Sequence, residues 1–149
     1  QNRGGRSMKK NTKGFTLIEL LAVIVILAII ALIAIPIVLN LINTARKGAA
    51  ARSAEGIRYS AQTYYYAQLV ENPDGSSTGK YGFGTTTGEG VTKYAKQFNF
   101  DGTEPTEGTV EISANGEVTG TDLKMGAYYC SFANTGSAKC DTSKVGALS

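Results

Sequence analysis

The chain has 149 residues, of which 42% are hydrophobic, and it carries 15 Lys and Arg against 12 Asp and Glu. It contains two cysteines and no histidine, so it lacks the most common general base and the most common metal ligand, and it cannot form a four-thiolate zinc site. We therefore expect no catalytic residues, no metal and no cofactor, and predict a single-domain protein that is not an enzyme.

A long apolar segment dominates the first third of the chain. Residues 13–35 read KGFTLIELLAVIVILAIIALIAI, with lysines at and before the start and one carboxylate, Glu19, near it. As a helix, residues 15–39 would be about 37 Å long, enough to cross a bilayer core of about 30 Å. The pattern predicts a transmembrane helix. The presence of Glu19 in this segment needs an explanation, because a lone carboxylate at the bilayer centre costs about 3 kcal/mol even on the hydrophobicity scales that give the lowest values.

The junction at residues 13–19, KGFTLIE, resembles the leader junction of type IV pilins and pseudopilins. The resemblance implies that a prepilin peptidase cuts between Gly14 and Phe15 and methylates the new amino terminus of Phe15. A secretory signal peptide fits less well, because the apolar run is too long and no small-x-small cleavage site follows it. A plain signal anchor explains the span but leaves Glu19 unexplained.

The resemblance divides the chain into three parts. Residues 1–14 form a cytoplasmic leader, in which residues 1–7 are treated as extraneous because Met8 opens a compact MKKNTKG. Residues 15–40 form the transmembrane and assembly helix, and residues 41–149 form an extracytoplasmic head. Five of the fifteen cations precede the cut, leaving ten against twelve acids, a net charge of −2. The five leader cations, which favour the cytoplasmic side, are Arg3, Arg6, Lys9, Lys10 and Lys13.

Two residues of the apolar helix have competing interpretations. Glu19 could stay hydrated near the interface, helped by the positive end of the helix. The resemblance implies instead that it pairs with the Phe15 ammonium of a neighbouring subunit and so fixes the axial register of a filament. Pro36 predicts a helix kink. The resemblance further implies that a stretch of about residues 28–36 can unwind in filaments, although its alanines favour a helix.

After Pro36 the pattern becomes amphipathic, which predicts that the helix continues beyond the membrane. The sequence Asn-Pro-Asp-Gly at residues 72–75 should end it, giving a helix of about 55 residues. The apolar positions at helical spacing are Ile42, Ala45, Ala49, Ile57, Ala61, Tyr64 and Leu69.

The remaining sequence predicts a small antiparallel sheet. Residues 72–90 look like a long surface loop, with Tyr81 and Phe83 as candidate anchors. Residues 91–98 fit a short helical face, with a strand at residues 97–100 as the alternative. Val110 and Ile112 alternate with polar residues before an Asn-Gly turn at 115–116, which predicts a β-hairpin continuing through Val118. Another strand is expected at residues 127–132. The predicted fold class is α+β, a long N-terminal helix packed on this sheet.

Cys130 and Cys140 bracket a polar segment. An exported head meets oxidising conditions, so we expect a disulfide rather than two free thiols, contributing about 2–4 kcal/mol. The resemblance supports this expectation, since pilins often close a C-terminal loop with a disulfide.

The scattered acids of the head are expected to be a solvated face rather than a calcium site. The eight tyrosines, including Tyr64, Tyr65 and Tyr66, are expected to pack between helix and sheet rather than to carry electrons.

The predicted function is that of a type IV pilin, a structural subunit that polymerises through its N-terminal helix into a surface filament for adhesion, twitching motility or DNA uptake. Its expected partners are copies of itself, the prepilin peptidase, the pilus assembly machinery and, before assembly, the cytoplasmic membrane. A nucleic-acid partner is expected only in a competence role. The alternatives are a pseudopilin of a type II secretion or competence system and a non-polymerising membrane-tethered binding module.

Overall fold

The computed structural model describes residues 4–5, 14–86, 88, 90–95 and 98–148. The five leader cations and Met8 lie outside the described residues. The chain divides into two units, Gln1–Leu41 and Ile42–Ser149, and each is described by itself.

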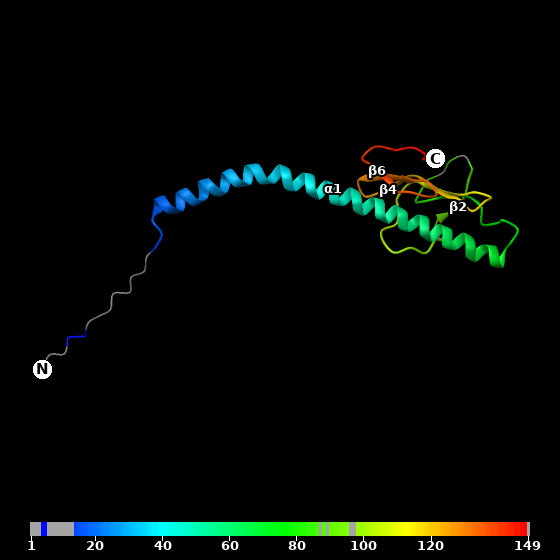
Figure 1. The fold of residues 1–149 in the computed structure, drawn as a ribbon, viewed down its shortest axis with the longest axis horizontal. Helices are drawn as coiled ribbons and strands as arrows, with labels where there is room; N and C mark the ends of the chain where they lie inside the picture. The colour runs from blue at the N-terminus through cyan, green and yellow to red at the C-terminus, as the bar shows by residue number, and fades with distance from the viewer. Residues whose placement is uncertain (1–3, 6–13, 87, 89, 96–97, 149) are drawn as a thin grey trace. The chain divides into compact units, whose positions relative to one another are not determined.

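Helix α1 (Leu17–Glu71) contains 55 residues (Figure 1). Both its length and its end at the Asn-Pro-Asp-Gly sequence are as predicted. The turn is held locally, because the Asp74 carboxylate accepts a hydrogen bond of 2.9 Å from the backbone N–H of Ser76. That bond lowers the pKa of Asp74. Gly75 adopts a positive φ of 80°, which L side chains rarely adopt.

The second unit contains one sheet of six strands in the order β2-β1-β3-β4-β5-β6. All neighbouring strands are antiparallel except β1 and β2, which are parallel. The predicted antiparallel sheet is therefore confirmed, with one parallel strand added at its edge. The strands are β1 (Gly79–Gly82), β2 (Val91–Tyr94), β3 (Thr109–Ile112), β4 (Val118–Met125), β5 (Tyr128–Phe132) and β6 (Lys139–Asp141).

The hairpin prediction is confirmed by β3 and β4, which pair from Ile112 opposite Val118 to Thr109 opposite Thr121. In the connecting turn the Gly116 N–H donates to the Ser113 carbonyl at 3.0 Å. Gly116 has a φ of 84°, and a Cβ there would lie 2.4 Å from the Tyr65 ring. Both its backbone conformation and its contact with α1 therefore require glycine. The strand expected at residues 127–132 corresponds to β5.

Two predictions for residues 72–98 are wrong. The segment read as a surface loop contains β1, which pairs with both β2 and β3. This strand has two glycines in four residues, so it shows almost no apolar alternation, and a Cβ on Gly82 would meet the Thr86 carbonyl oxygen at 2.8 Å.

The segment read as a helical face begins with the edge strand β2, where pairing with β1 overrides the i, i+3 spacing. In the alternative strand at residues 97–100, residue 97 lies outside the described residues, and Asn99 and Phe100 are not in a strand.

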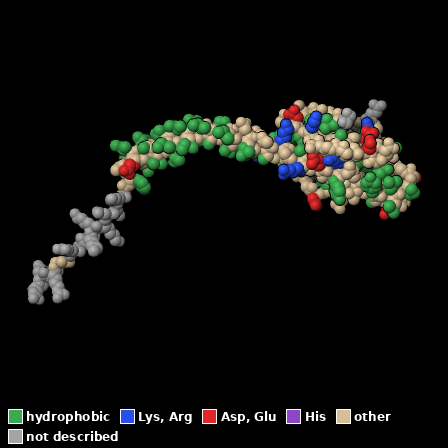
Figure 2. Space-filling model, in the orientation of Figure 1, with side chains coloured by type: hydrophobic (Ala, Val, Ile, Leu, Met, Phe, Trp, Pro, Cys, Tyr) green, Lys and Arg blue, Asp and Glu red, His purple; other side chains and the backbone are tan. Residues whose placement is uncertain are grey.

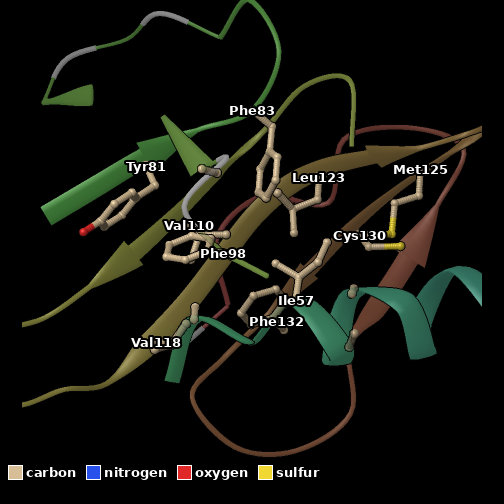
Figure 3. Close-up of a cluster of buried hydrophobic side chains, with 14 of the residues drawn as sticks. Ile57, Tyr81, Phe83, Phe98, Val110, Val118, Leu123, Met125, Cys130 and Phe132 are labelled. Carbon is tan, nitrogen blue, oxygen red and sulfur yellow. The ribbon is translucent and has the colours of Figure 1, made fainter. Parts of the chain in front are cut away.

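The core lies between the second half of α1 and one face of the sheet (Figure 3). Ala54, Ile57 and Ala61 are fully buried on the helix. The sheet contributes Val110, Ile112, Val118, Leu123 and Phe132, all at most 1% exposed. Tyr81 and Phe83, expected as loop anchors, are core residues instead. Burial raises the pKa of Tyr81, whose hydroxyl donates a 2.6 Å hydrogen bond to the Ser77 carbonyl.

Candidate assembly helix and disulfide-bonded loop

The large apolar side chains of the first half of α1 are exposed all along the helix. Figure 2 shows them covering the face in view. One stretch of 18 residues has a mean hydropathy of 3.4 and no buried residue, which is long and apolar enough to cross a membrane. The exposed fractions of Ile24, Ile30 and Leu39 are 54%, 55% and 55%. Such a surface is not stable in water, so it needs lipid or other apolar helices around it.

The predicted cleavage junction lies just before this helix. Gly14 and Phe15 are exposed and non-helical, and Phe15 is 83% exposed. Thr16 caps the helix, because its hydroxyl oxygen accepts a 3.3 Å hydrogen bond from the Glu19 N–H and its carbonyl accepts one of 3.1 Å from the Leu20 N–H. Glu19 is therefore at the third helical position, where an acid favours the positive end of the helix.

The Thr16 cap was not part of the sequence interpretation, although a threonine three residues before a glutamate is a known signal for one. The cap holds Glu19 in the first turn of α1, close in sequence to the amino terminus that cleavage would create. Pro36 lies inside α1, and its kink stays a prediction, as do the roles of Gly14, Phe15 and Glu19.

The predicted disulfide between Cys130 and Cys140 is present. The two cysteines are directly opposite each other in β5 and β6, with Cα atoms 4.1 Å apart. The bond closes the loop between these strands and ties the three-residue edge strand β6 to the sheet. Strand β6 itself was not predicted, since three residues are too few to show a period.

Helix α1 also binds this loop through polar side chains. The Arg58 guanidinium donates hydrogen bonds to the carbonyls of Ala133 at 3.0 Å and Gly136 at 2.7 Å. It also lies 5.8 Å from the centroid of the Phe132 ring, within range of a cation–π interaction. One turn earlier, the Glu55 carboxylate accepts a 3.0 Å hydrogen bond from the Ala138 N–H. The loop is thus fixed at both ends to the helix as well as by the disulfide.

A third contact links helix, loop and hairpin. The Asn134 side-chain oxygen accepts hydrogen bonds from the Gln62 amide at 3.4 Å and from the Val118 N–H at 2.9 Å. These partners are separated in sequence by 72 and 16 residues. The sequence did not predict these contacts. A polar residue on an amphipathic helix is expected to face solvent unless its partner is known.

Two acids of the head accept hydrogen bonds from backbone groups. The Asp122 carboxylate accepts a 2.8 Å hydrogen bond from the Gly146 N–H, and that of Asp141 accepts one of 2.7 Å from the Thr142 N–H. Asp122 is in the left-handed region, with a φ of 50°, where β4 bulges. In the part of the chain that the structure describes, no three His, Cys, Asp or Glu residues are grouped so that they could hold a metal ion.

The tyrosines of α1 divide between the core and the surface. The Tyr64 ring packs edge-on against Phe98 at 5.4 Å and Tyr81 at 6.0 Å, which places it in the helix–sheet contact as expected. Tyr59 and Tyr66 are 71% and 65% exposed. They share one helix face with Val70, which is 86% exposed, on the side away from the core.

The comparisons with known proteins support the N-terminal resemblance. Residues 9–35 match the prokaryotic N-terminal methylation motif, the class III prepilin leader of the type IV pilin and pseudopilin family. The match covers the leader and the apolar helix but not the head. No curated protein and no solved structure matches the chain. Members of this family are structural proteins rather than enzymes, and a membrane-anchored N-terminal helix is typical of their precursors.

Proposed function

We propose that this type IV pilin-like protein is the structural subunit of a type IV pilus, cut after Gly14 and polymerised through α1 into a surface filament. Two observations support this proposal. One is the match to the methylation motif, and the other is an apolar helix segment that the described residues of the chain leave exposed. Before assembly, lipid covers the helix. In the filament, the same surface packs against the helices of neighbouring subunits.

The proposal rests mainly on the position of Glu19 in the sequence. Cleavage between Gly14 and Phe15 creates an ammonium group four residues before this carboxylate. In a bundle of apolar helices, each Glu19 pairs with the Phe15 ammonium of a neighbour, and a shifted neighbour leaves both charges unpaired. The Thr16 cap supports this geometry by holding Glu19 in the first helical turn. The pair sets the register of the subunits, while the apolar contacts supply cohesion.

The head offers a second surface for packing between subunits. Tyr59, Tyr66 and Val70 form an exposed apolar stripe on the face of α1 opposite its buried residues. An exposed stripe of this kind favours a protein neighbour over water. In the proposed filament, it lies against another copy of the chain.

A pseudopilin of a secretion or competence system is the second candidate, because the methylation motif and the apolar helix are common to both roles. The experiment that separates these roles is electron microscopy of material sheared from cells, with mass spectrometry of its main protein. We expect long filaments built mainly of this chain and beginning at Phe15. Surface fractions without such filaments, from cells that contain the processed protein, would favour the pseudopilin or a non-polymerising tethered module.

A further inference from the structure

A groove of about 710 Å³ opens on the second unit between the start of its part of α1 and the C-terminal segment. Its space depends on small residues. A Cβ placed on Gly48 would meet nothing within 4 Å, and Ala51 and Ala138 lie beside it. Val145 and the disulfide-bonded Cys140 add apolar surface. The groove is large enough for a small polar headgroup and the first carbons attached to it.

Three lysines, Lys47, Lys139 and Lys144, line this groove, and all three are exposed. No residue that the structure describes accepts a hydrogen bond from their ammonium groups or forms an ion pair with them. Asp141 also lines the groove, but its carboxylate already accepts hydrogen bonds from the N–H and hydroxyl of Thr142. The groove therefore has a net positive charge and suits an anion.

The groove begins close in the chain to the membrane segment. Lys47 is six residues after Leu41, the last residue of the first unit. Six residues reach at most about 20 Å when extended and about 9 Å in a helix, whatever the angle between the units. The headgroup layer adds about 5–8 Å on each side of the bilayer core, and a lysine side chain extends several Å further. The Lys47 ammonium group is thus within reach of lipid phosphates, and Lys139 and Lys144 line the same groove.

The charges after the span are unusual for their position. Arg46, Lys47 and Arg52 follow the apolar segment on the side that the proposed orientation exports. Cations within about 15 residues of a span favour the cytoplasmic side, so these three oppose the orientation that the leader cations impose. Of these three cations only Lys47 lines the groove, where an anionic ligand would offset its charge.

We infer that the groove binds the phosphate of an anionic phospholipid in the outer leaflet while the subunit is anchored in the membrane. Lys47, Lys139 and Lys144 supply point charges to the phosphate, and the apolar wall contacts the glycerol carbons. The inference rests on the membrane anchoring in the proposed function but not on polymerisation. The two can therefore fail separately.

The test uses the full chain, purified in a non-ionic detergent and freed of lipid. Native mass spectrometry then measures retention of palmitoyl-oleoyl phosphatidylglycerol against the zwitterionic phosphatidylcholine with the same acyl chains. We expect wild type to retain phosphatidylglycerol selectively. Because each lysine near an anionic lipid contributes about fivefold in affinity, Lys47→Gln should lose about fivefold, and Lys139→Gln with Lys144→Gln roughly 10- to 30-fold. These exposed positions should not affect folding, which near-ultraviolet circular dichroism checks.

The matched control is the pair Arg46→Gln with Arg52→Gln, which removes two exposed cations of the same region that do not line the groove. It should retain most of the selectivity. Equal losses in both double variants would overturn the inference in favour of diffuse attraction near the membrane. Unchanged lipid retention in the lysine variants, with fewer sheared filaments, would also overturn it and assign the groove to a second copy of the chain.

Discussion

The two halves of α1 belong to one helix, but their apolar side chains are in opposite environments. In the first half, apolar side chains surround the helix, and Leu20, Val25 and Leu32 are 53%, 51% and 75% exposed. In the second half, one face is fully buried by the sheet, as Ala54 and Ile57 show. One apolar face of the second half is covered by its own chain, whereas the apolar surface of the first half needs lipid or other apolar helices around it.

This difference shows which residues determine how each half packs against its neighbours. In the second half, polar residues such as Glu55 and Arg58 select one loop of the same chain, at defined carbonyl and N–H groups. In the first half, uniform aliphatic surfaces pack almost equally well at several registers, and in the proposed filament the single charge at Glu19 selects one. The following experiments test this comparison.

The largest effect is expected at the junction, where Gly14→Glu should leave the precursor uncut. Without the new Phe15 amino terminus, the first half of α1 stays in the membrane and no surface filaments form. The head should still fold, because the residues of its core cluster lie between Ala50 and Cys140 in the sequence. Intact-mass measurement of membrane fractions checks this, and assembled filaments carrying an uncut Met8 terminus would contradict it.

The next effect is expected for Glu19→Leu, which should insert into the membrane at least as well as wild type. Assembly should fail or become irregular, because the Phe15 ammonium would enter the apolar bundle unpaired, at roughly 3–5 kcal/mol. The measurement is filament yield in sheared fractions alongside membrane levels of the subunit. Normal filaments in cells without a wild-type copy would exclude a register role for Glu19.

A matched pair of truncations compares the two halves directly. Ile57→Ala should lower the free energy of unfolding of the head by about 2–5 kcal/mol, because Ile57 is 0% exposed. Ile29→Ala removes the same atoms from a side chain that is 54% exposed, and head stability should not change. Urea unfolding of the detergent-solubilised chain, followed by tyrosine signals, measures both. Equal effects of the two changes would mean that the two halves are not energetically separate.

Removal of the disulfide by Cys130→Ser with Cys140→Ser should cost about 2–4 kcal/mol of head stability. The polar contacts of Glu55 and Arg58 with the loop should keep it near the helix in the variant. The expected outcome is a folded head with a lower midpoint of unfolding and a loop more open to proteolysis. A midpoint equal to that of wild type would show that α1 alone is enough to hold the loop.

The smallest effect is expected for Arg58→Ala, at about 1–3 kcal/mol, since it removes hydrogen bonds from two loop carbonyls. Arg58→Lys should recover only part of this, because an ammonium cannot reproduce the planar fork of the guanidinium. Arg52→Ala, at an exposed position six residues earlier, is the control and should change the free energy of unfolding by no more than about 0.5 kcal/mol. Matching losses at residues 52 and 58 would argue against a specific loop contact.

Features that depend on residues close in sequence were determined by the sequence itself. The apolar run, the helix end at residues 72–75 and the Asn-Gly hairpin each follow from local conformational preferences or from hydrophobic periodicity. The Gly14–Phe15–Glu19 spacing is a local motif that the family resemblance interprets. The disulfide was expected from two cysteines in a head that was predicted to be exported.

The tertiary structure decided what depends on distant partners. Strand β1 exists because β2 and β3 pair with it on either side, since its two glycines give no alternation of their own. The contacts of Arg58 and Glu55 depend on a loop more than 70 residues away. The grouping of Lys47 with Lys139 and Lys144 likewise brings together opposite ends of the head. A sequence pattern records the periodicity of one segment, while such contacts are fixed only when separate segments pack around one core.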